Sequence, residues 1–142
     1  MAGYQNPVIP GFHPDPSVCR GPDAYYLATS SFTWAPGVPI FRSENLTEWT
    51  LIGNALDRDS QLDLRETAMW ASFGIYAPTL RFHAGRFWMI TTVNDTARGP
   101  QNFFVTADDP AGPWSDPVPV DIPGIDPDIA WDDDGNCWVH HA

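Results

Sequence analysis

"DPSVCRGPDAYYLATSS", residues 15–31, is the first of three similar stretches in this chain. The other two are "APTLRFHAGRFWMITTV" at 77–93 and "DPDIAWDDDGNCWVHHA" at 126–142. Each begins with a small or acidic residue and a proline, and continues with a short alternating run, a polar turn and an aromatic-rich run. Such alternation between turn residues predicts a β-hairpin. The same hairpin therefore occurs three times, with its proline recurring after 62 residues, from Pro16 to Pro78, and after 49, from Pro78 to Pro127.

A second repeated element follows the first two hairpins. Residues 41–50, "FRSENLTEWT", and 105–115, "VTADDPAGPWS", both run from a predicted strand through a polar turn to a tryptophan, Trp49 or Trp114. Four strands at this spacing are typical of a β-propeller blade, and a propeller closes with about four to eight blades. We therefore predict an all-β fold in which residues 1–142 supply two blades and the opening hairpin of a third. The alternative is a complete β-sandwich of about seven to ten strands.

Composition limits the partners of this chain. Its 142 residues are 43% hydrophobic, enough for one core, and its formal net charge is −11. That charge repels nucleic acid and anionic membrane surfaces and favours neutral or cationic ligands. No apolar run approaches the roughly 18 residues of a membrane span, and the opening residues do not resemble a signal peptide. We therefore expect a cytoplasmic protein, with Cys19 and Cys137 as free, packed thiols.

Two aspartates occupy equivalent places in the repeats. Asp15 and Asp126 each precede the proline that opens a predicted inner strand, and Ala77 stands there in the second copy. Equivalent positions of a propeller converge on its axis, so we expect both carboxylates to face one central pocket, with Ala77 leaving room for a ligand. The following proline is expected to hold each aspartate in an extended conformation. Paired carboxylates across a pocket for a neutral substrate suit glycoside hydrolysis.

Other roles for these acids remain open at this point. Pro-Asp-Pro is also ordinary turn chemistry, which makes Asp15 a candidate loop residue. Asp128 would share a strand face with Asp126 and is a rival for its role. The acidic run at 132–134 precedes Gly135 and predicts a hairpin turn, because the alternate-ligand spacing of a calcium loop is absent.

Aromatic residues near the predicted axis supply the other half of a sugar site, because a sugar ring packs on an aromatic face. Phe32 and Trp34 lie on a loop after the first hairpin, and Trp70 and Tyr76 precede the second. Each of them either lines the pocket or belongs to the core. His13 adjoins Asp15 and either contacts a ligand or is an ordinary loop histidine. The pair at 140–141 lacks further ligands at useful spacing, so no metal site is predicted.

Four ordered motifs resemble the N-terminal part of glycoside hydrolase family 43, in particular its β-xylosidase and α-L-arabinofuranosidase group. They are "NPVIPGFHPDPSVCR" (6–20), "YYLATSSFTWAPGVPIFRSENLTEW" (25–49), "YAPTLRFHAGRFWMITT" (76–92) and "GIDPDIAWDDDGNCWV" (124–139). The resemblance implies a five-bladed β-propeller that hydrolyses β-xylosides or α-L-arabinofuranosides from non-reducing ends with inversion. It implies no organic cofactor, a structural calcium in some members, and often a β-sandwich downstream.

The resemblance also assigns roles. Asp15 matches the general base, and Asp126 matches the aspartate that raises the pKa of the general acid and orients it. The other residues that we predict to line the substrate site are His13, Phe32, Trp34, Tyr76, Ala77 and Ile125.

The general acid of the family is a glutamate on a later blade. The three glutamates of this chain, at 44, 48 and 66, do not occupy the axial repeat position. We therefore expect residues 1–142 to be the N-terminal part of a catalytic propeller and to be inactive alone. In two places the chain departs from the group, because Tyr76 stands where tryptophan is frequent and Asp128 where serine is common. The choice between xylosidase and arabinofuranosidase stays open, as does a non-catalytic carbohydrate-binding or scaffold propeller.

Overall fold

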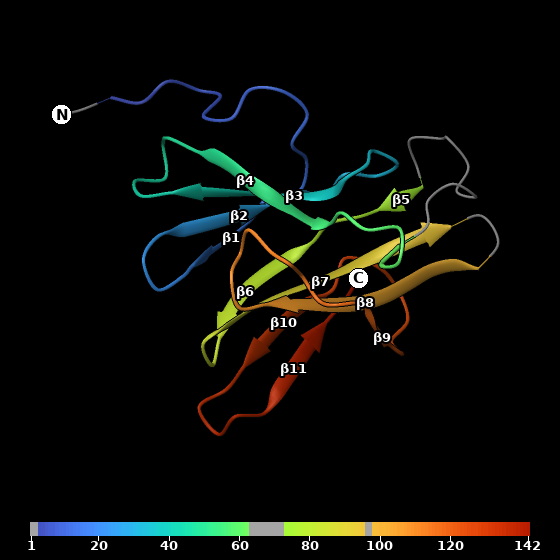
Figure 1. Cartoon of the computed structure of the whole chain (residues 1–142). Helices are drawn as coiled ribbons and strands as arrows, with labels where there is room; N and C mark the ends of the chain where they lie inside the picture. The colour runs from blue at the N-terminus through green and yellow to red at the C-terminus, as the bar shows by residue number, and fades with distance from the viewer. Residues whose placement is uncertain (1–2, 63–72, 96–97) are drawn as a thin grey trace.

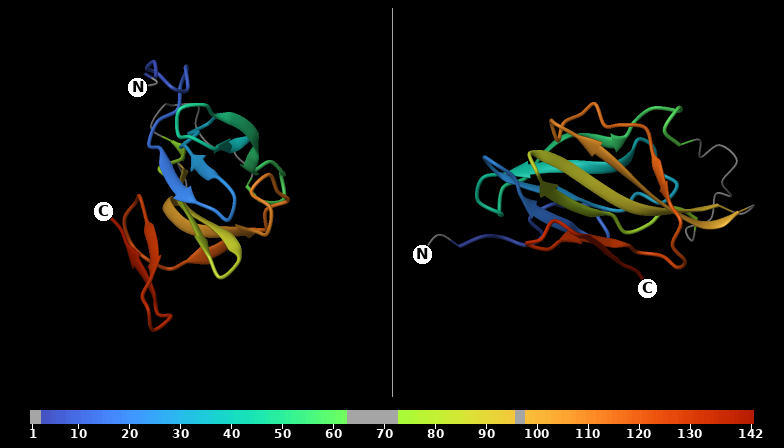
Figure 2. Two further views of the ribbon diagram at one scale, coloured as in Figure 1. Left: turned by 90° about the vertical axis from the view of Figure 1, so that its left-hand side faces the viewer. Right: turned by 90° about the horizontal axis from the view of Figure 1, so that it is seen from below.

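The computed structural model describes residues 3–62, 73–95 and 98–142 and contains three antiparallel sheets that follow one another in chain order (Figure 1, Figure 2). Trp70 and Glu66 lie outside these ranges. No helix in the described ranges is long and apolar enough to cross a membrane.

The first sheet is a four-stranded blade, and the five-stranded second sheet contains another. Blade 1 has the order β1 (Ser17–Arg20), β2 (Tyr25–Ala28), β3 (Gly37–Ser43), β4 (Thr50–Leu56). Blade 2 has the order β6 (Thr79–His83), β7 (Arg86–Asp95), β8 (Gly99–Ala107), β9 (Val118–Val120). A short additional strand, β5 (Gly74–Ile75), pairs with the end of β7. The predicted inner hairpin and outer pair are therefore confirmed in both blades, and the sandwich alternative is wrong.

The third sheet is the hairpin of β10 (Asp128–Trp131) and β11 (Cys137–His140). The predicted turn between these strands is confirmed, and the side chain of Asp132 organises it. One carboxylate oxygen accepts hydrogen bonds from the backbone N–H groups of Asp134 (3.1 Å) and Asn136 (2.8 Å). The other accepts from Asn136 Nδ2 (3.0 Å) and from the indole Nε1 of Trp138 (2.8 Å). These bonds, first those from Trp138 and Asn136, lower the pKa of Asp132 below its ordinary value of 3.8.

The lowered pKa of Asp132 predicts how the stability of this hairpin depends on pH. A carboxyl group whose pKa is lower in the folded state stabilises it above the unfolded pKa, and this contribution is lost as the pH falls through the folded value. We expect Asp132→Asn to be less stable than the wild type at neutral pH and the difference to shrink below about pH 4. Denaturant unfolding at several pH values measures it. Asp133→Asn in the same turn is the control, and a difference that persists unchanged at about pH 2 would contradict the prediction.

The inner strands of the three sheets lie side by side. Strand β6 contacts both β1 and β10. The hydroxyl of Ser17 on β1 accepts a hydrogen bond from the backbone N–H of Leu80 (3.0 Å), and Arg81 forms an ion pair with Asp128 at the start of β10 (2.6 Å). These contacts join residues near the start of each strand. The positions just before those strands, where the repeat has Asp15, Ala77 and Asp126, are therefore gathered at one end of the array.

One hydrophobic core lies between the first two blades and holds them together. Its fully buried side chains come from both sheets and include Val38, Ile40, Ile75, Leu80, Phe87, Met89, Val105 and Trp114. Cys19 belongs to this core, and burial raises the pKa of its thiol to about 11, although the positive charge of Arg81 opposes the shift. Cys137 is also free but exposed. The expectation of unpaired thiols is therefore confirmed, whereas the expectation that both are packed is wrong, because the outward face of β11 is uncovered.

Candidate active site

The two axial aspartates share an uncommon backbone conformation. The φ angle is 53° at Asp15 and 54° at Asp126, whereas Ala77 at the equivalent place in blade 2 does not have a positive φ. The prediction that proline would hold both aspartates extended was wrong. The preference of a residue before proline is a local one, and hydrogen bonds from neighbouring strands override it here. Such a conformation costs a non-glycine residue on the order of 1–3 kcal/mol and is concentrated at functional sites.

Asp15 is held through its side chain. The hydroxyl of Ser30, just after β2, donates a hydrogen bond to Oδ2 of Asp15 (2.7 Å). The backbone N–H of Ser30 also donates to the carbonyl of Pro14 (3.0 Å), so one buried residue fixes both the loop and the carboxylate. Asp15 itself is exposed. Ser30 was not predicted, although its place 15 residues after Asp15 in the repeat could have indicated it.

Asp126 is exposed and is held through its backbone. Its N–H donates to the hydroxyl of Thr92 on β7 (3.2 Å). The rival carboxylate, Asp128, is occupied by its short ion pair with Arg81, which joins blade 2 to the third sheet. This arrangement favours Asp126 for the axial role.

An aromatic row crosses from the N-terminal segment to blade 2. The ring of Phe32 lies 6.1 Å from the ring of Phe12 and 5.9 Å from that of Tyr76, measured between centroids. The backbone of Phe32 forms a two-way bridge with Ile75 of β5, with N···O distances of 2.8 and 3.0 Å. Phe12 was not predicted, because nothing in the local sequence indicates that an N-terminal loop folds back onto Phe32.

A pocket of about 300 Å³ lies beside Asp15 and contains two of the predicted residues, His13 and Trp34. The rest of its lining is Phe12, Ser30, Ser31, Pro36, Pro39 and Asn54. Trp34 is 72% exposed and so lines the pocket and not the core. The ring of His13 packs edge-on against Phe41, with its buried Nδ1 atom unpaired in this structure.

The remaining predicted residues lie toward the second and third sheets. The hydroxyl of Tyr76 accepts a hydrogen bond from Asn94 Nδ2 (2.6 Å), and the carbonyl of Ala77 accepts one from Thr91 Oγ1 (3.3 Å). Ile125 exchanges two backbone hydrogen bonds with Ala142 (3.0 and 3.3 Å). The predicted residues thus form one group around Asp15 and another before β10, with Ala77 between them.

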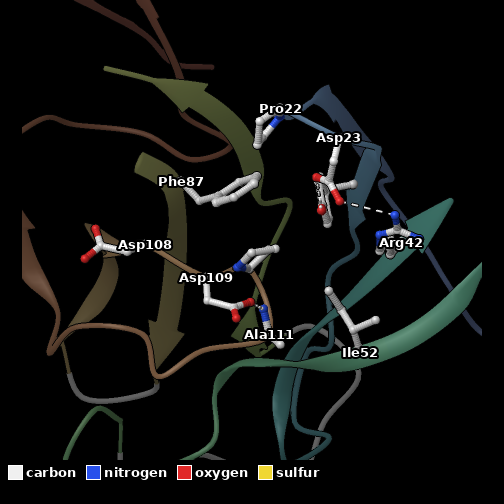
Figure 3. A pocket seen from close by; sticks show the side chains of 10 residues that line it. Pro22, Asp23, Arg42, Ile52, Phe87, Asp108, Asp109 and Ala111 are labelled. Atoms are coloured by element: carbon white, nitrogen blue, oxygen red, sulfur yellow. Dashed lines mark hydrogen bonds and ion pairs between the residues drawn. The ribbon is translucent and has the colours of Figure 1, made fainter. Parts of the chain in front are cut away.

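A separate hollow of about 410 Å³ lies at the opposite end of the inner strands (Figure 3). It is bounded by the turn after β1 and the turn after β8, and none of the predicted site residues lines it. Asp23 in this hollow accepts a hydrogen bond from Tyr26 (2.7 Å) and pairs with Arg42 (3.2 Å). These two contacts lower the pKa of Asp23, which is therefore engaged in structure.

Metal chemistry has no ligand set among the residues described. Within 3–62, 73–95 and 98–142, no three side chains of histidine, cysteine, aspartate or glutamate come together in a metal-binding group. The structural calcium that the family resemblance implies for some members stays a prediction.

Successive four-stranded antiparallel blades, with an aspartate before the first strand of the first and the third sheet, are typical of a β-propeller. The sequence model of glycosyl hydrolases family 43 matches residues 4–142, and the chain belongs to this family. The predicted fold, the first part of a five-bladed propeller, is thereby confirmed.

The chain is similar to several members of the family. It is 54% identical over 141 residues to a xylosidase/arabinosidase of Butyrivibrio fibrisolvens, covering 97% of this chain and 26% of that protein. It is 47% identical over 131 residues to a non-reducing end α-L-arabinofuranosidase of Bacteroides ovatus, covering 92% and 24%. The crystal structure of a xylan β-1,4-xylosidase of Bacillus halodurans superimposes with a TM-score of 0.89 at 45% identity, covering 96% and 27%. The chain thus spans about a quarter of the length of these relatives.

Proposed function

We propose that residues 1–142 are the N-terminal part of the catalytic propeller of an inverting, exo-acting β-xylosidase that acts on xylo-oligosaccharides. The observation that carries this proposal is the pair Asp15 and Asp126, exposed at equivalent repeat positions with the same left-handed backbone. The pocket that contains Ser30, the partner of Asp15, is lined by Phe12 and Trp34 and by no acidic side chain, which suits a neutral sugar. The names of the relatives support xylosidase activity. The cytoplasmic location stays a prediction.

In this proposal Asp15 is the general base. The hydrogen bond from Ser30 occupies Oδ2 and holds the carboxylate in one direction. The other oxygen is then available to take a proton from a water molecule as it attacks the anomeric carbon from the face opposite the leaving group. Direct displacement by water inverts the configuration at that carbon.

Asp126 is assigned to orienting the general acid, a glutamate supplied by a later part of the enzyme. The described glutamates of this chain are engaged elsewhere, because Glu44 pairs with Arg42 (3.1 Å) and Glu48 accepts from Asn45 (3.1 Å), both beside the outer turn of blade 1. Residues 1–142 alone are therefore expected to lack the general acid and to be inactive.

A second candidate is α-L-arabinofuranosidase activity at the same site. The 47% identity to the arabinofuranosidase of Bacteroides ovatus favours it. Both activities use a general base and a general acid, so the proposed role of Asp15 fits either sugar.

Hydrolysis assays on the full-length enzyme test both candidates. We expect release of p-nitrophenol from p-nitrophenyl β-xyloside, less from p-nitrophenyl α-L-arabinofuranoside, and α-xylose as the first sugar detected by proton NMR. Initial appearance of β-xylose would contradict the inverting mechanism. A folded full-length protein that hydrolyses neither glycoside would favour a non-catalytic propeller.

A further inference from the structure

Two buried polar residues lie opposite each other on β7 and β8, next to the segment that leads into Asp126. Thr92 and Asn102 are cross-strand partners and are 0% and 3% exposed. The hydroxyl of Thr92 donates to Oδ1 of Asn102 (2.6 Å). A buried polar pair adds little net stability compared with an apolar pair of the same shape. Stability alone therefore does not explain why a polar pair is buried at this place.

The pair holds the segment that leads into Asp126. Nδ2 of Asn102 donates to the carbonyls of Ile122 (3.1 Å) and Gly124 (3.2 Å). The oxygen of Thr92 accepts from the backbone N–H of Asp126 (3.2 Å). These bonds also set the orientation of the amide, because a flipped Asn102 would place its oxygen against two carbonyl oxygens. Residues 122–126 are thus attached to blade 2 at three points.

This attachment acts where the backbone needs support. The left-handed φ of Asp126 is unfavourable for a side chain with a Cβ and persists only when its surroundings hold it. Thr92 bonds the N–H of that same residue.

A hydroxyl residue at the same repeat position contacts each of the two aspartates. Thr92 follows Ala77 by 15 residues, as Ser30 follows Asp15. Ser30 holds the carboxylate of Asp15 within blade 1, whereas Thr92 reaches from blade 2 to the backbone of Asp126 in the next sheet.

We propose that Thr92 and Asn102 are positioning residues that hold Asp126 in its catalytic orientation, an inference that rests on the proposed function. Because small misplacements of a catalytic group can cost up to about 100-fold in rate, Thr92→Val should lower kcat by about 10- to 100-fold. KM should change by less than about threefold, because Asp126 acts on the transition state and not on ground-state binding. Thr92→Ser keeps the hydroxyl and should retain most of the wild-type kcat.

The experiment measures kcat, KM and thermal unfolding of the full-length enzyme on p-nitrophenyl β-xyloside, for Thr92→Val, Asp126→Asn and the double variant. If Thr92 acts through Asp126, Thr92→Val should have little further effect on kcat in the Asp126→Asn background. Ser43→Ala is the matched control. It removes another buried hydroxyl, which accepts from the N–H of Leu46 (2.8 Å) at the outer turn of blade 1, and should lower Tm with kcat unchanged.

The outcomes separate this inference from the proposed function. An active wild type whose kcat is unchanged by Thr92→Val, or whose two variants have multiplicative effects, would overturn the positioning role alone. A drop in kcat that Thr92→Ser shares in full would also overturn it. A folded wild type with no activity on either glycoside would overturn the proposed function and this inference with it.

Discussion

Asp15→Asn should lower kcat/KM of the full-length enzyme by about 100- to 10,000-fold, the range that a general base contributes. Asparagine has nearly the same shape and can still accept the hydrogen bond that Ser30 donates to Asp15. It cannot take a proton from water. The fold should therefore persist while the attacking water is no longer activated.

Steady-state hydrolysis of p-nitrophenyl β-xyloside, with thermal unfolding of the same samples, measures this effect. Asp109→Asn is the matched control, because Asp109 is also exposed and its carboxylate accepts a hydrogen bond, from the N–H of Ala111 (2.9 Å), in the hollow at the other end of the blades. The control should retain wild-type kcat/KM. A fall of less than about tenfold in Asp15→Asn would remove Asp15 from the role of base.

Gly74→Ala should lower the free energy of unfolding by about 2–5 kcal/mol. Gly74 has a φ of +96°, and an added Cβ would overlap the carbonyl group of Phe32. The strain of a left-handed residue and the overpacking against a backbone group therefore act together. Relief requires β5 to move away from Phe32, which would break the bridge between Phe32 and Ile75 and shift the aromatic row. We also expect KM for the xyloside to rise.

The variant Gly85→Ala separates backbone strain from overpacking as causes of the lost stability. Gly85 lies in the β6–β7 turn with a φ of +79°, and an added Cβ there meets nothing within 4 Å. Its substitution should cost only the backbone strain, about 1–2 kcal/mol, and leave KM unchanged. Urea denaturation compares the two variants. Equal losses of stability would mean that the close approach of Gly74 to Phe32 is unimportant.

The predictions that succeeded depend on local patterns. Alternation of apolar residues specifies which face of a strand is buried, and turn residues specify where it ends, so the three hairpins could be located from the chain alone. The repeat then placed Asp15 and Asp126 at equivalent positions. Asp132 was likewise recognised as part of a hairpin turn, because its bonds reach only as far as Trp138.

The features that escaped prediction involve residues far apart in the chain. The left-handed conformation of Asp126 depends on Thr92, which is 34 residues earlier. Phe12 joins the aromatic row only because the N-terminal segment folds back onto Phe32. The local sequence pattern predicts neither of these two contacts.

Periodicity and turn chemistry in the sequence by themselves determined the blade architecture and the repeat position of the two acids, because these follow from interactions among neighbouring residues. Only the tertiary structure decided the backbone conformation of Asp15 and Asp126, the engagement of Asp128 by Arg81 and the hydroxyls that hold each axial acid. Ser30 contacts Asp15 across blade 1, whereas Thr92 and Arg81 of blade 2 contact Asp126 and Asp128 of the third sheet. Such contacts exist only once the chain has folded, so the local preference of a residue before proline does not predict their effect on the backbone.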